Sequence, residues 1–309
     1  MQKLILHDSA NNDIHVYLYE PAEKPCKGIV HLIHGASEHF ARYGLFAEFL
    51  TKNGYAVIGA DFLGHGLSTP TTDYVHFADH DGAELAFESV TLVKDYIAKN
   101  FPDLPVYLLG HSMGSFLARL TLLRYPDFYK KAVISGTGYM SKLLMFGASF
   151  IGGLIRLFKG PRYVSPLMNK LGLESYNAKM IKDGLIPKDG LPEQWLTKNV
   201  EIQQYYHDSP MCGQPFTVTA YADLMVWLKF INNYANIKKG NLDMPLFFLS
   251  GALDPVSNYG KEVEKLVSDF MRAGYKSVVL KLFANDRHEV LNELDNQTAY
   301  RDILDFLNK

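Results

Sequence analysis

Apolar residues run almost without interruption through four short segments in the first half of the chain. These segments are residues 28–33, 55–60, 106–109 and 132–135, and a strand-like run at 15–19 precedes them. Strands that helices cover on both faces are continuously apolar, whereas half-exposed strands alternate with polar residues. The pattern therefore predicts buried strands in the middle of a sheet.

Helical spacing appears between these runs. Residues 83–100 have apolar side chains at near-helical intervals, and residues 113–125 form a second helical segment that Pro126 ends. We therefore expect helices to connect neighbouring strands.

The same alternation returns near the end of the chain. Residues 246–250 and 278–283 read as strands, and a helix with one apolar face lies between them, with Gly274 where its C-terminal cap is expected. A last helix is expected at 298–307. Strands that alternate with helices predict an α/β fold with a mostly parallel sheet.

Residues 139–240 break this alternation. They contain both tryptophans and six of the ten methionines, and their apolar residues have helical rather than strand periodicity. The simplest interpretation is a helical cap inserted between two strands. Residues 1–138 and 241–309 would then form the core, and residues 139–240 the cap.

Composition and charge exclude several classes of protein. The chain has 309 residues, 31 basic and 33 acidic side chains and a net charge of -2, which gives no electrostatic reason to expect nucleic acid or an anionic membrane as a partner. Two cysteines are too few for a disulfide framework. The most apolar stretch, 143–158, is shorter than the roughly 20 residues of a membrane span. The first ten residues have no apolar run of secretory type, so we expect a cytoplasmic protein without stable membrane insertion.

The strand at 106–109 leads directly into Gly110-His111-Ser112-Met113-Gly114, and a helix follows. A sharp turn from strand to helix raises a serine above the sheet, and flanking glycines leave room for that turn. The start of the helix directs backbone N–H groups toward the reacting oxygen. Ser112 is therefore the candidate nucleophile.

A second loop, His34-Gly35-Ala36-Ser37-Glu38-His39, follows the strand at 28–33. The backbone N–H groups of Ala36 and Met113 are candidates for an oxyanion hole, which stabilises a tetrahedral intermediate. Ser37 and Glu38 are candidates for loop geometry or for the pocket wall. His31 and His34 are three residues apart beside a strand and point to opposite faces, so no metal site is expected.

A serine nucleophile needs a histidine base, and the base needs a carboxylate that fixes its tautomer. Asp254 follows the strand at 246–250, while the other common position for the acid, residues 136–138, holds no carboxylate. His288 follows the strand at 278–283. Asp286 and Glu289 are close to it in sequence and are expected to stay solvated.

These motifs resemble those of monoacylglycerol lipases and lysophospholipases, relatives of the S33 serine aminopeptidases. The same resemblance includes the segment Asp61-Phe62-Leu63-Gly64-His65-Gly66-Leu67-Ser68. The resemblance covers nearly the whole chain and is weakest in the cap. It implies an α/β-hydrolase fold with an eight-stranded sheet, a helical cap after the sixth strand and no cofactor. Its triad matches Ser112, Asp254 and His288. Those relatives usually have glycine at the position of Ser37, so the oxyanion loop differs.

The cap is expected to shape the substrate pocket. Met140, Met145 and Phe150 belong to a flexible apolar stretch suited to a lipid chain, and burial in the interior of the cap is the alternative role. The sequence thus favours an ester hydrolase acting on monoacylglycerols, lysophospholipids or similar single-chain esters, with transient contact between the cap and a lipid interface. The alternatives are an aminopeptidase, amidase or short-chain esterase, and a relative that binds a ligand without catalysis.

Overall fold

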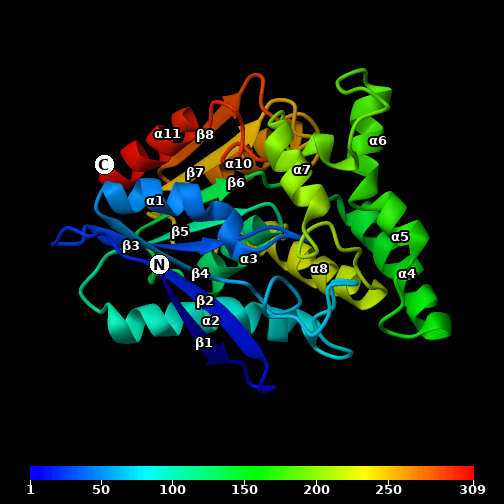
Figure 1. The fold of residues 1–309 in the computed structure, drawn as a ribbon, viewed down its shortest axis with the longest axis horizontal. Helices are drawn as coiled ribbons and strands as arrows, with labels where there is room; N and C mark the ends of the chain where they lie inside the picture. The colour runs from blue at the N-terminus through cyan, green and yellow to red at the C-terminus, as the bar shows by residue number, and fades with distance from the viewer.

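A sheet of eight strands runs through the computed structural model, which describes residues 1–309 (Figure 1). The strands are β1 Gln2–His7, β2 Asp13–Tyr19, β3 Gly28–Ile33, β4 Tyr55–Ala60, β5 Val106–His111, β6 Lys131–Ser135, β7 Leu246–Gly251 and β8 Val278–Phe283. Their order across the sheet is β1-β2-β4-β3-β5-β6-β7-β8. The pairs β1–β2 and β2–β4 are antiparallel, and all other neighbouring pairs are parallel. The predicted α/β fold with a mostly parallel sheet is confirmed.

Every strand that the apolar runs predicted is present, and one further strand, β1, was not predicted from them. β1 lies at the edge of the sheet, and its side chains are exposed or half-buried along its whole length. An edge strand with few buried side chains carries little apolar signal, because pairing through the backbone does not require one. Only the resemblance to known hydrolases implied the eighth strand.

Helices cover both faces of this sheet. They are α1 Gly44–Lys52, α2 Gly82–Asn100, α3 Met113–Arg124, α4 Lys142–Lys159, α5 Pro166–Leu171, α6 Glu174–Lys182, α7 Val200–Asp208, α8 Val218–Ile231, α9 Tyr234–Ile237, α10 Lys261–Ala273 and α11 Gln297–Asn308, with 3-10 helices η1 Phe40–Tyr43 and η2 Pro192–Trp195. The buried side chains of α1 and α11 join a core on one face. Those of α2, α3, α8 and α10 join a larger core on the other face. Because both faces are covered, the central strands are buried throughout.

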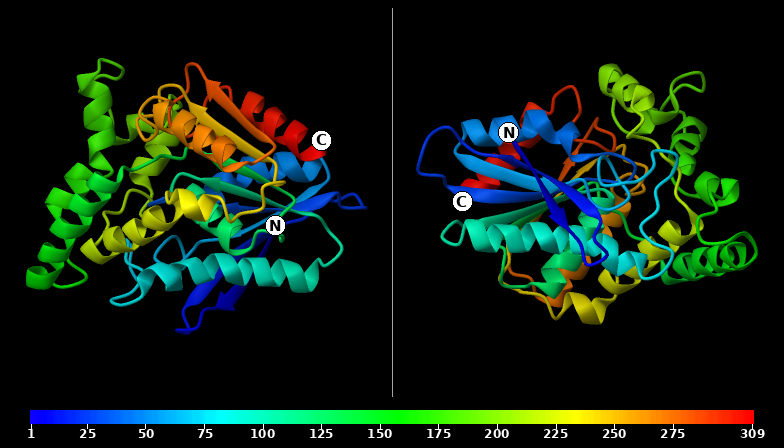
Figure 2. Two further views of the ribbon diagram at one scale, coloured as in Figure 1. Left: turned by 180° about the vertical axis from the view of Figure 1, so that it is seen from behind. Right: turned by 60° about the horizontal axis from the view of Figure 1, so that its bottom comes forward.

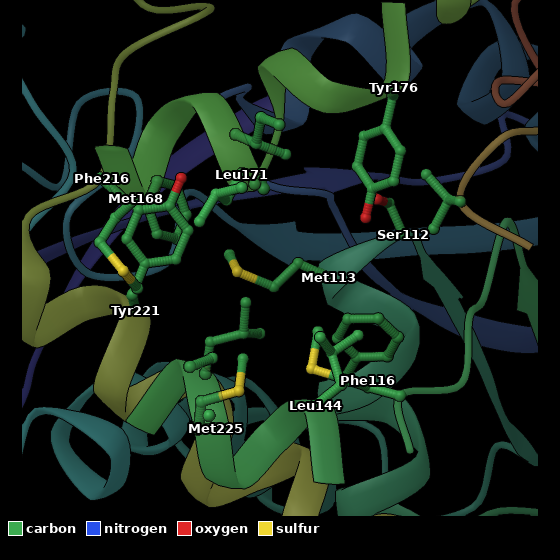
Figure 3. A pocket seen from close by; sticks show the side chains of 18 of the residues that line it. Ser112, Met113, Phe116, Leu144, Met168, Leu171, Tyr176, Phe216, Tyr221 and Met225 are labelled. Carbon is green, nitrogen blue, oxygen red and sulfur yellow. The ribbon is translucent and has the colours of Figure 1, made fainter. Parts of the chain in front are cut away.

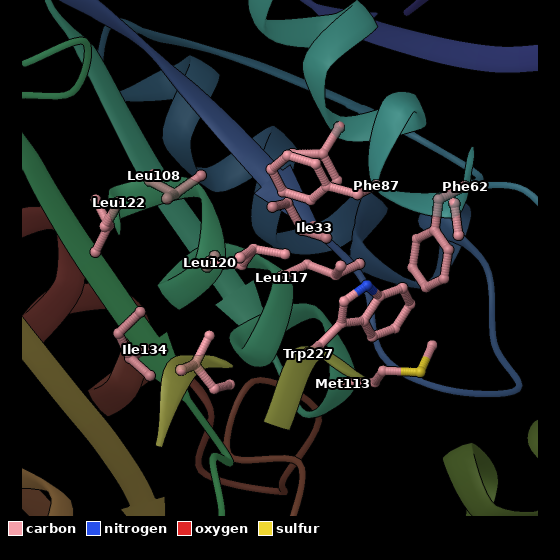
Figure 4. Close-up of a cluster of buried hydrophobic side chains, with 14 of the residues drawn as sticks. Ile33, Phe62, Phe87, Leu108, Met113, Leu117, Leu120, Leu122, Ile134 and Trp227 are labelled. Carbon is pink, nitrogen blue, oxygen red and sulfur yellow. The ribbon is translucent and has the colours of Figure 1, made fainter. Parts of the chain in front are cut away.

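Helix α8 connects the segment between β6 and β7 to the larger core. Figure 4 shows Trp227 of this helix among side chains of the sheet and of α3, such as Leu117. The indole Nε1 of Trp227 donates a hydrogen bond to the carbonyl oxygen of Ala83 on α2 (3.0 Å). The division into a core and a cap at 139–240 stays a prediction. Helix α8 lies within residues 139–240 in sequence, but its buried side chains belong to the larger core.

Helices α4, α5 and α6 gather at one end of the molecule, away from α1 and α11 (Figure 2). They lie between β6 and β7 in the chain. Parallel strands end at the same edge of a sheet, so the loops that follow β3, β5, β7 and β8 lie together. No helix combines the length and the apolar character needed to cross a membrane.

Candidate active site

Ser112 occupies the turn between β5 and α3, in a backbone conformation that side chains rarely adopt. Its φ is +53° and its ψ is -122°. A Cβ atom on Gly110 would collide with the backbone of Gly114, and one on Gly114 would collide with the carbonyl oxygens of Ile33 and His34. The two glycines thus permit the close approach of strand and helix that holds Ser112 above the sheet.

Ser112, His288 and Asp254 form a continuous line of hydrogen bonds. Ser112 Oγ donates to His288 Nε2 (2.8 Å), and His288 Nδ1 donates to Asp254 Oδ1 (3.0 Å). The same carboxylate oxygen accepts from the backbone N–H of Val256 (2.8 Å), which fixes its orientation. Asp254 is fully buried and His288 nearly so. The three predicted residues meet although 176 positions separate Ser112 from His288 in the chain.

The surroundings of His288 favour its protonated form. Burial alone would lower its pKa, but the charge and the hydrogen bond of Asp254 outweigh burial, so the pKa is raised above the usual value for histidine. Trp195 of η2 covers the imidazole, with ring centroids 5.0 Å apart. This arrangement can accept a proton from Ser112 and stabilise the resulting imidazolium.

Two backbone N–H groups near Ser112 are available to a negatively charged oxygen. The N–H of Ala36 makes no hydrogen bond within the protein, and Met113 is the first residue of α3, where helical N–H groups lack an acceptor in their own helix. Both residues line the same cavity as Ser112. The geometry therefore offers the predicted pair of donors for a tetrahedral intermediate.

Ser37 adopts the left-handed conformation that glycine favours, with φ at +52°. Its hydroxyl donates to the carbonyl oxygen of Gln214 (2.7 Å), and its own carbonyl accepts from the N–H of Gly213 (2.9 Å). These bonds tie the oxyanion loop to the chain before α8 and explain how serine replaces the usual glycine. Ser37 does not line the cavity, so it supports the loop rather than the pocket wall.

A buried group of charges lies behind the oxyanion loop. Glu38 Oε1 accepts from the N–H of Gly35 (2.5 Å) and from the hydroxyl of Tyr43 (2.7 Å). Arg42 forms an ion pair with Glu38 and two hydrogen bonds with Glu289 (2.8 and 2.7 Å), and all three side chains are at most 4% exposed. This group joins the oxyanion loop to the residue that follows His288. The spacing of four between Glu38 and Arg42 was no signal for it, because Glu38 lies in the loop before η1 and not on a helix.

The expectation that Asp286 and Glu289 stay solvated is wrong. Glu289 is 3% exposed and bound to Arg42, and Asp286 is 3% exposed and bound to Lys198 (2.9 Å). Burial would raise the pKa of Glu289, but Arg42 lowers it to about 2. Both acids are buried because the loop after β8 folds back under the segment at 195–198, which proximity in sequence did not reveal.

A cavity of about 660 Å³ opens at Ser112, in the middle of the range of ~300–1,000 Å³ that is usual for ligand pockets. Eighteen of its 22 lining residues are hydrophobic. Figure 3 shows Ser112 on one side, Tyr221, Phe216 and Met168 on the opposite side, and Met113 between them. Such a cavity fits an apolar chain attached to the carbonyl that Ser112 would attack.

The cavity includes only some of the residues predicted for it. Met140 lines it, together with Leu144 and Ile151 of α4. Met145 and Phe150 do not: Met145 is buried in the larger core, and Phe150 is 59% exposed on the outer face. The rotation of α4 about its axis decides which face meets the cavity, and a composition argument cannot supply that rotation. Most other lining residues were also missed, because they come from distant segments that only the fold brings together.

A much smaller cavity adjoins Ser112 on the side of the oxyanion loop. Its lining includes Glu38, Tyr206, His288 and Glu289. Glu38 therefore lines this small cavity rather than the large one. Neither cavity has a lysine or an arginine in its lining.

No group of three or more histidine, cysteine or carboxylate side chains is arranged to hold a metal ion. His31 Nδ1 and the hydroxyl of Tyr129 share a hydrogen bond (2.9 Å), and His34 Nδ1 lies 2.8 Å from the carbonyl oxygen of Gly35. Burial lowers the pKa of both histidines to about 3, so both are neutral structural side chains.

The chain resembles known proteins along most of its length. The family model for serine aminopeptidases of type S33 matches residues 24–295. A monoacylglycerol lipase from Mycolicibacterium smegmatis is 26% identical over 284 residues, which cover 91% of this chain and 88% of that protein. Monoglyceride lipase from Mus musculus is 31% identical over 116 residues, so this chain matches only 36% of that protein's length.

Solved structures share the fold. A highly thermostable carboxyl esterase from Bacillus coagulans, determined in complex with glycerol, has a TM-score of 0.86 at 21% identity, with 99% of this chain and 97% of that chain covered. Since the family model covers most of the residues, including both loops around Ser112 and the loops of Asp254 and His288, this chain belongs to the S33 serine aminopeptidase family and has the α/β-hydrolase fold.

Proposed function

We propose that the protein is a carboxylic ester hydrolase in which Ser112, His288 and Asp254 act as a catalytic triad. The observation that carries this proposal is the hydrogen-bonded line of these three residues at the end of a large apolar cavity. In the reaction, Ser112 Oγ attacks the ester carbonyl while His288 Nε2 takes its proton. Asp254 holds the imidazole and stabilises its charge.

The N–H groups of Ala36 and Met113 stabilise the oxygen that becomes negative in the tetrahedral intermediate. His288 then gives its proton to the leaving alcohol, and an acyl-enzyme on Ser112 remains. Water attacks this acyl-enzyme with His288 as general base, which releases the acid and restores the serine.

We propose monoacylglycerols and similar neutral single-chain esters as substrates. The apolar lining of the large cavity suits one acyl chain, and the volume is larger than an acetyl group requires. Phosphate groups are usually bound by arginine or lysine, and neither residue type lines the two cavities. Monoacylglycerols are therefore favoured over lysophospholipids.

The aminopeptidase alternative is less well supported. A free α-amine needs a carboxylate partner in the pocket, and the carboxylates in the small cavity, Glu38 and Glu289, are already paired with Arg42.

Contact with a lipid surface through α4 is part of this proposal. Leu143, Phe146, Leu157 and Phe158 are at least 68% exposed on this helix, and Leu143 also lines the cavity. Residues 141–182 contain seven lysines or arginines and one acidic residue. The net charge of the whole chain gives no reason to expect an anionic membrane, but this local excess of basic side chains beside an apolar face suits a lipid interface that contains anionic lipid.

The test of substrate class is a series of p-nitrophenyl esters of increasing acyl length, followed by monoacylglycerols, lysophospholipids and an aminoacyl anilide. Each buried methylene contributes about 0.8 kcal/mol, so kcat/KM should rise about fourfold per methylene until the cavity is full. A series that peaks at acetate, or cleavage of the anilide alone, would overturn the substrate proposal.

Lipid contact is tested by sedimentation with vesicles. Wild-type protein should bind phosphatidylcholine vesicles with added phosphatidylglycerol. The double variant Leu157→Asp/Phe158→Asp should bind them weakly and still cleave a water-soluble ester, because neither residue lines the cavity. Equal binding by both proteins would exclude α4 as the contact.

A further inference from the structure

Trp195 belongs to the walls of both cavities at Ser112 and is in contact with the base. It lies at the end of η2 and packs on the imidazole of His288, with ring centroids 5.0 Å apart and ring planes 33° apart. Rings at this distance and angle form an offset stack, in which the ring faces overlap in part. The base is therefore covered by the face of the indole.

The residues on either side of the indole are bonded to those on either side of the base. Arg287 Nη1 donates to the carbonyl oxygen of Gln194 (2.6 Å), and the N–H of Glu289 donates to that of Leu196 (2.7 Å). The indole also packs on the ring of Tyr176, with centroids 5.0 Å apart. These contacts fix the segment of the indole against the loop of the base, so the indole keeps its place on the imidazole.

Three carboxylates act on the charge of the imidazole, and only one of them has no cationic partner. Asp254 accepts the hydrogen bond of His288 Nδ1 (3.0 Å), whereas Glu38 and Glu289 are ion-paired with Arg42. The guanidinium of Arg42 offsets much of the attraction between these two carboxylates and an imidazolium.

Two rings complete the surroundings of the imidazole. The ring of His111 lies 4.8 Å from that of His288 and is neutral, because burial and the charge of His288 lower the pKa of His111 to about 4. The other ring is the indole of Trp195. An indole face attracts a cation within about 6 Å of its centroid, and more strongly where water is excluded. His288 is 1% exposed, so little water competes with this contact.

We propose that Trp195 is a positioning residue for the base, and that its indole face stabilises the positive charge that His288 acquires with the proton of Ser112. The same contact holds the imidazole in the orientation in which it reaches both Ser112 and Asp254. This inference rests on the proposed ester hydrolysis and adds one residue to its triad.

The first test measures kcat/KM for p-nitrophenyl butyrate against pH, since this short ester occupies little of the large cavity. Trp195→Leu keeps an apolar cover but removes the aromatic face, so the midpoint of the acid limb should fall by about one pH unit. Trp195→Phe keeps an aromatic face and should lower the midpoint by less than half as much. Trp227→Phe, the same exchange at the other tryptophan, is the matched control. It should leave the midpoint unchanged even if the melting temperature falls, because Trp227 lies in the larger core.

The second test is spectroscopic and leaves Trp195 in place. In Trp227→Phe, Trp195 is the only tryptophan, and an imidazolium in contact with an indole quenches its fluorescence. The emission should therefore fall with decreasing pH, with the same midpoint as kcat/KM. His288→Gln in the same background should abolish this step.

An unchanged or higher midpoint in Trp195→Leu would overturn the inference. It would mean that the indole only excludes water, whose entry raises the pKa of a buried histidine. If Trp195→Leu does not fold, a missing fluorescence step, or one that persists in His288→Gln, would overturn it instead. If the wild-type protein cleaves no ester at any pH, the proposed ester hydrolysis itself fails, and the fluorescence titration still decides whether the indole contacts a protonated His288.

Discussion

Replacing Arg42 with methionine tests the buried charge group behind the oxyanion loop. Methionine keeps much of the side-chain volume but leaves the carboxylates of Glu38 and Glu289 buried without their cation. Breaking a buried ion pair by removing one partner costs about 3–5 kcal/mol. At about 2.1 cal/mol/K per residue, a chain of 309 residues has an unfolding entropy of roughly 650 cal/mol/K near its midpoint. The melting temperature should therefore fall by about 6 °C for a loss of about 4 kcal/mol.

The loss in Arg42→Met should depend on pH in a defined direction. The folded pKa of Glu289 is lowered to about 2, so in the wild type its stabilisation is complete above the unfolded value near 4.5 and disappears only as pH falls toward 2. Without Arg42, burial raises this pKa instead, and the folded variant gains stability as pH falls and the carboxyl takes up a proton. The gap in melting temperature between the two proteins should thus narrow between pH 8 and pH 5.

The assay is thermal unfolding followed by circular dichroism at several pH values, together with kcat on a soluble ester. The value of kcat should fall, because Glu38 also holds the N–H of Gly35 in the oxyanion loop. The fall should be no greater than the ~10²–10³-fold loss of kcat that follows removal of one oxyanion donor. Arg124→Met is the matched control. Its partner Glu84 is 58% exposed, so this variant should lose at most about 1 kcal/mol. Equal losses in the two variants, or a gap that widens in acid, would refute the reasoning.

Three further predictions concern single side chains. The profile of kcat/KM against pH should fall in acid with a midpoint above the ~6.5 of an ordinary histidine, because Asp254 raises the pKa of His288. Asp254→Asn should lower kcat roughly 10⁴-fold and shift that midpoint toward acid, and a wild-type midpoint below ~6 would contradict this reasoning. In urea unfolding, Ser37→Gly should keep nearly the wild-type free energy of unfolding, because relief of the left-handed backbone offsets the lost hydrogen bond. Ser37→Ala keeps the strained backbone and should lose about 1 kcal/mol. A Gly variant less stable than the Ala variant would count against the strain argument. Burial raises the pKa of Asp223 to about 7, so the wild type loses stability as pH rises from ~4 through ~7. Asp223→Asn should be more stable than the wild type at pH ~8, by up to about 4 kcal/mol, and should have the same melting temperature as the wild type at pH ~4. A stability difference that does not change with pH would exclude this origin.

The sequence predicted the part of the fold that depends on local pattern. Buried strands such as β5 are continuous in apolar residues, and the glycines around Ser112 mark a turn that few other residues permit. Gly274 ends α10 with φ at +104°, as a C-terminal cap should. Asp254 and His288 were found because each follows a strand, and the ends of parallel strands converge.

What the sequence did not predict depends on contacts between distant segments. Arg42 binds Glu289 across 247 positions, and no local pattern identifies that partner. Met145 and Phe150 do not line the cavity, because apolar character alone does not define which side of α4 faces it. Trp195 meets His288, and Tyr176 meets Trp195, only because the chain between β6 and β7 folds over the triad.

The most direct test of the proposed triad is mass spectrometry after reaction with a fluorophosphonate, which labels activated serines. The wild-type protein should gain one adduct, located on the peptide that contains Ser112. Ser112→Ala should gain none, while its circular dichroism spectrum stays unchanged and its kcat falls on the order of a millionfold. An adduct at another serine in the wild type, or undiminished labelling of Ser112→Ala, would contradict the assignment of the nucleophile.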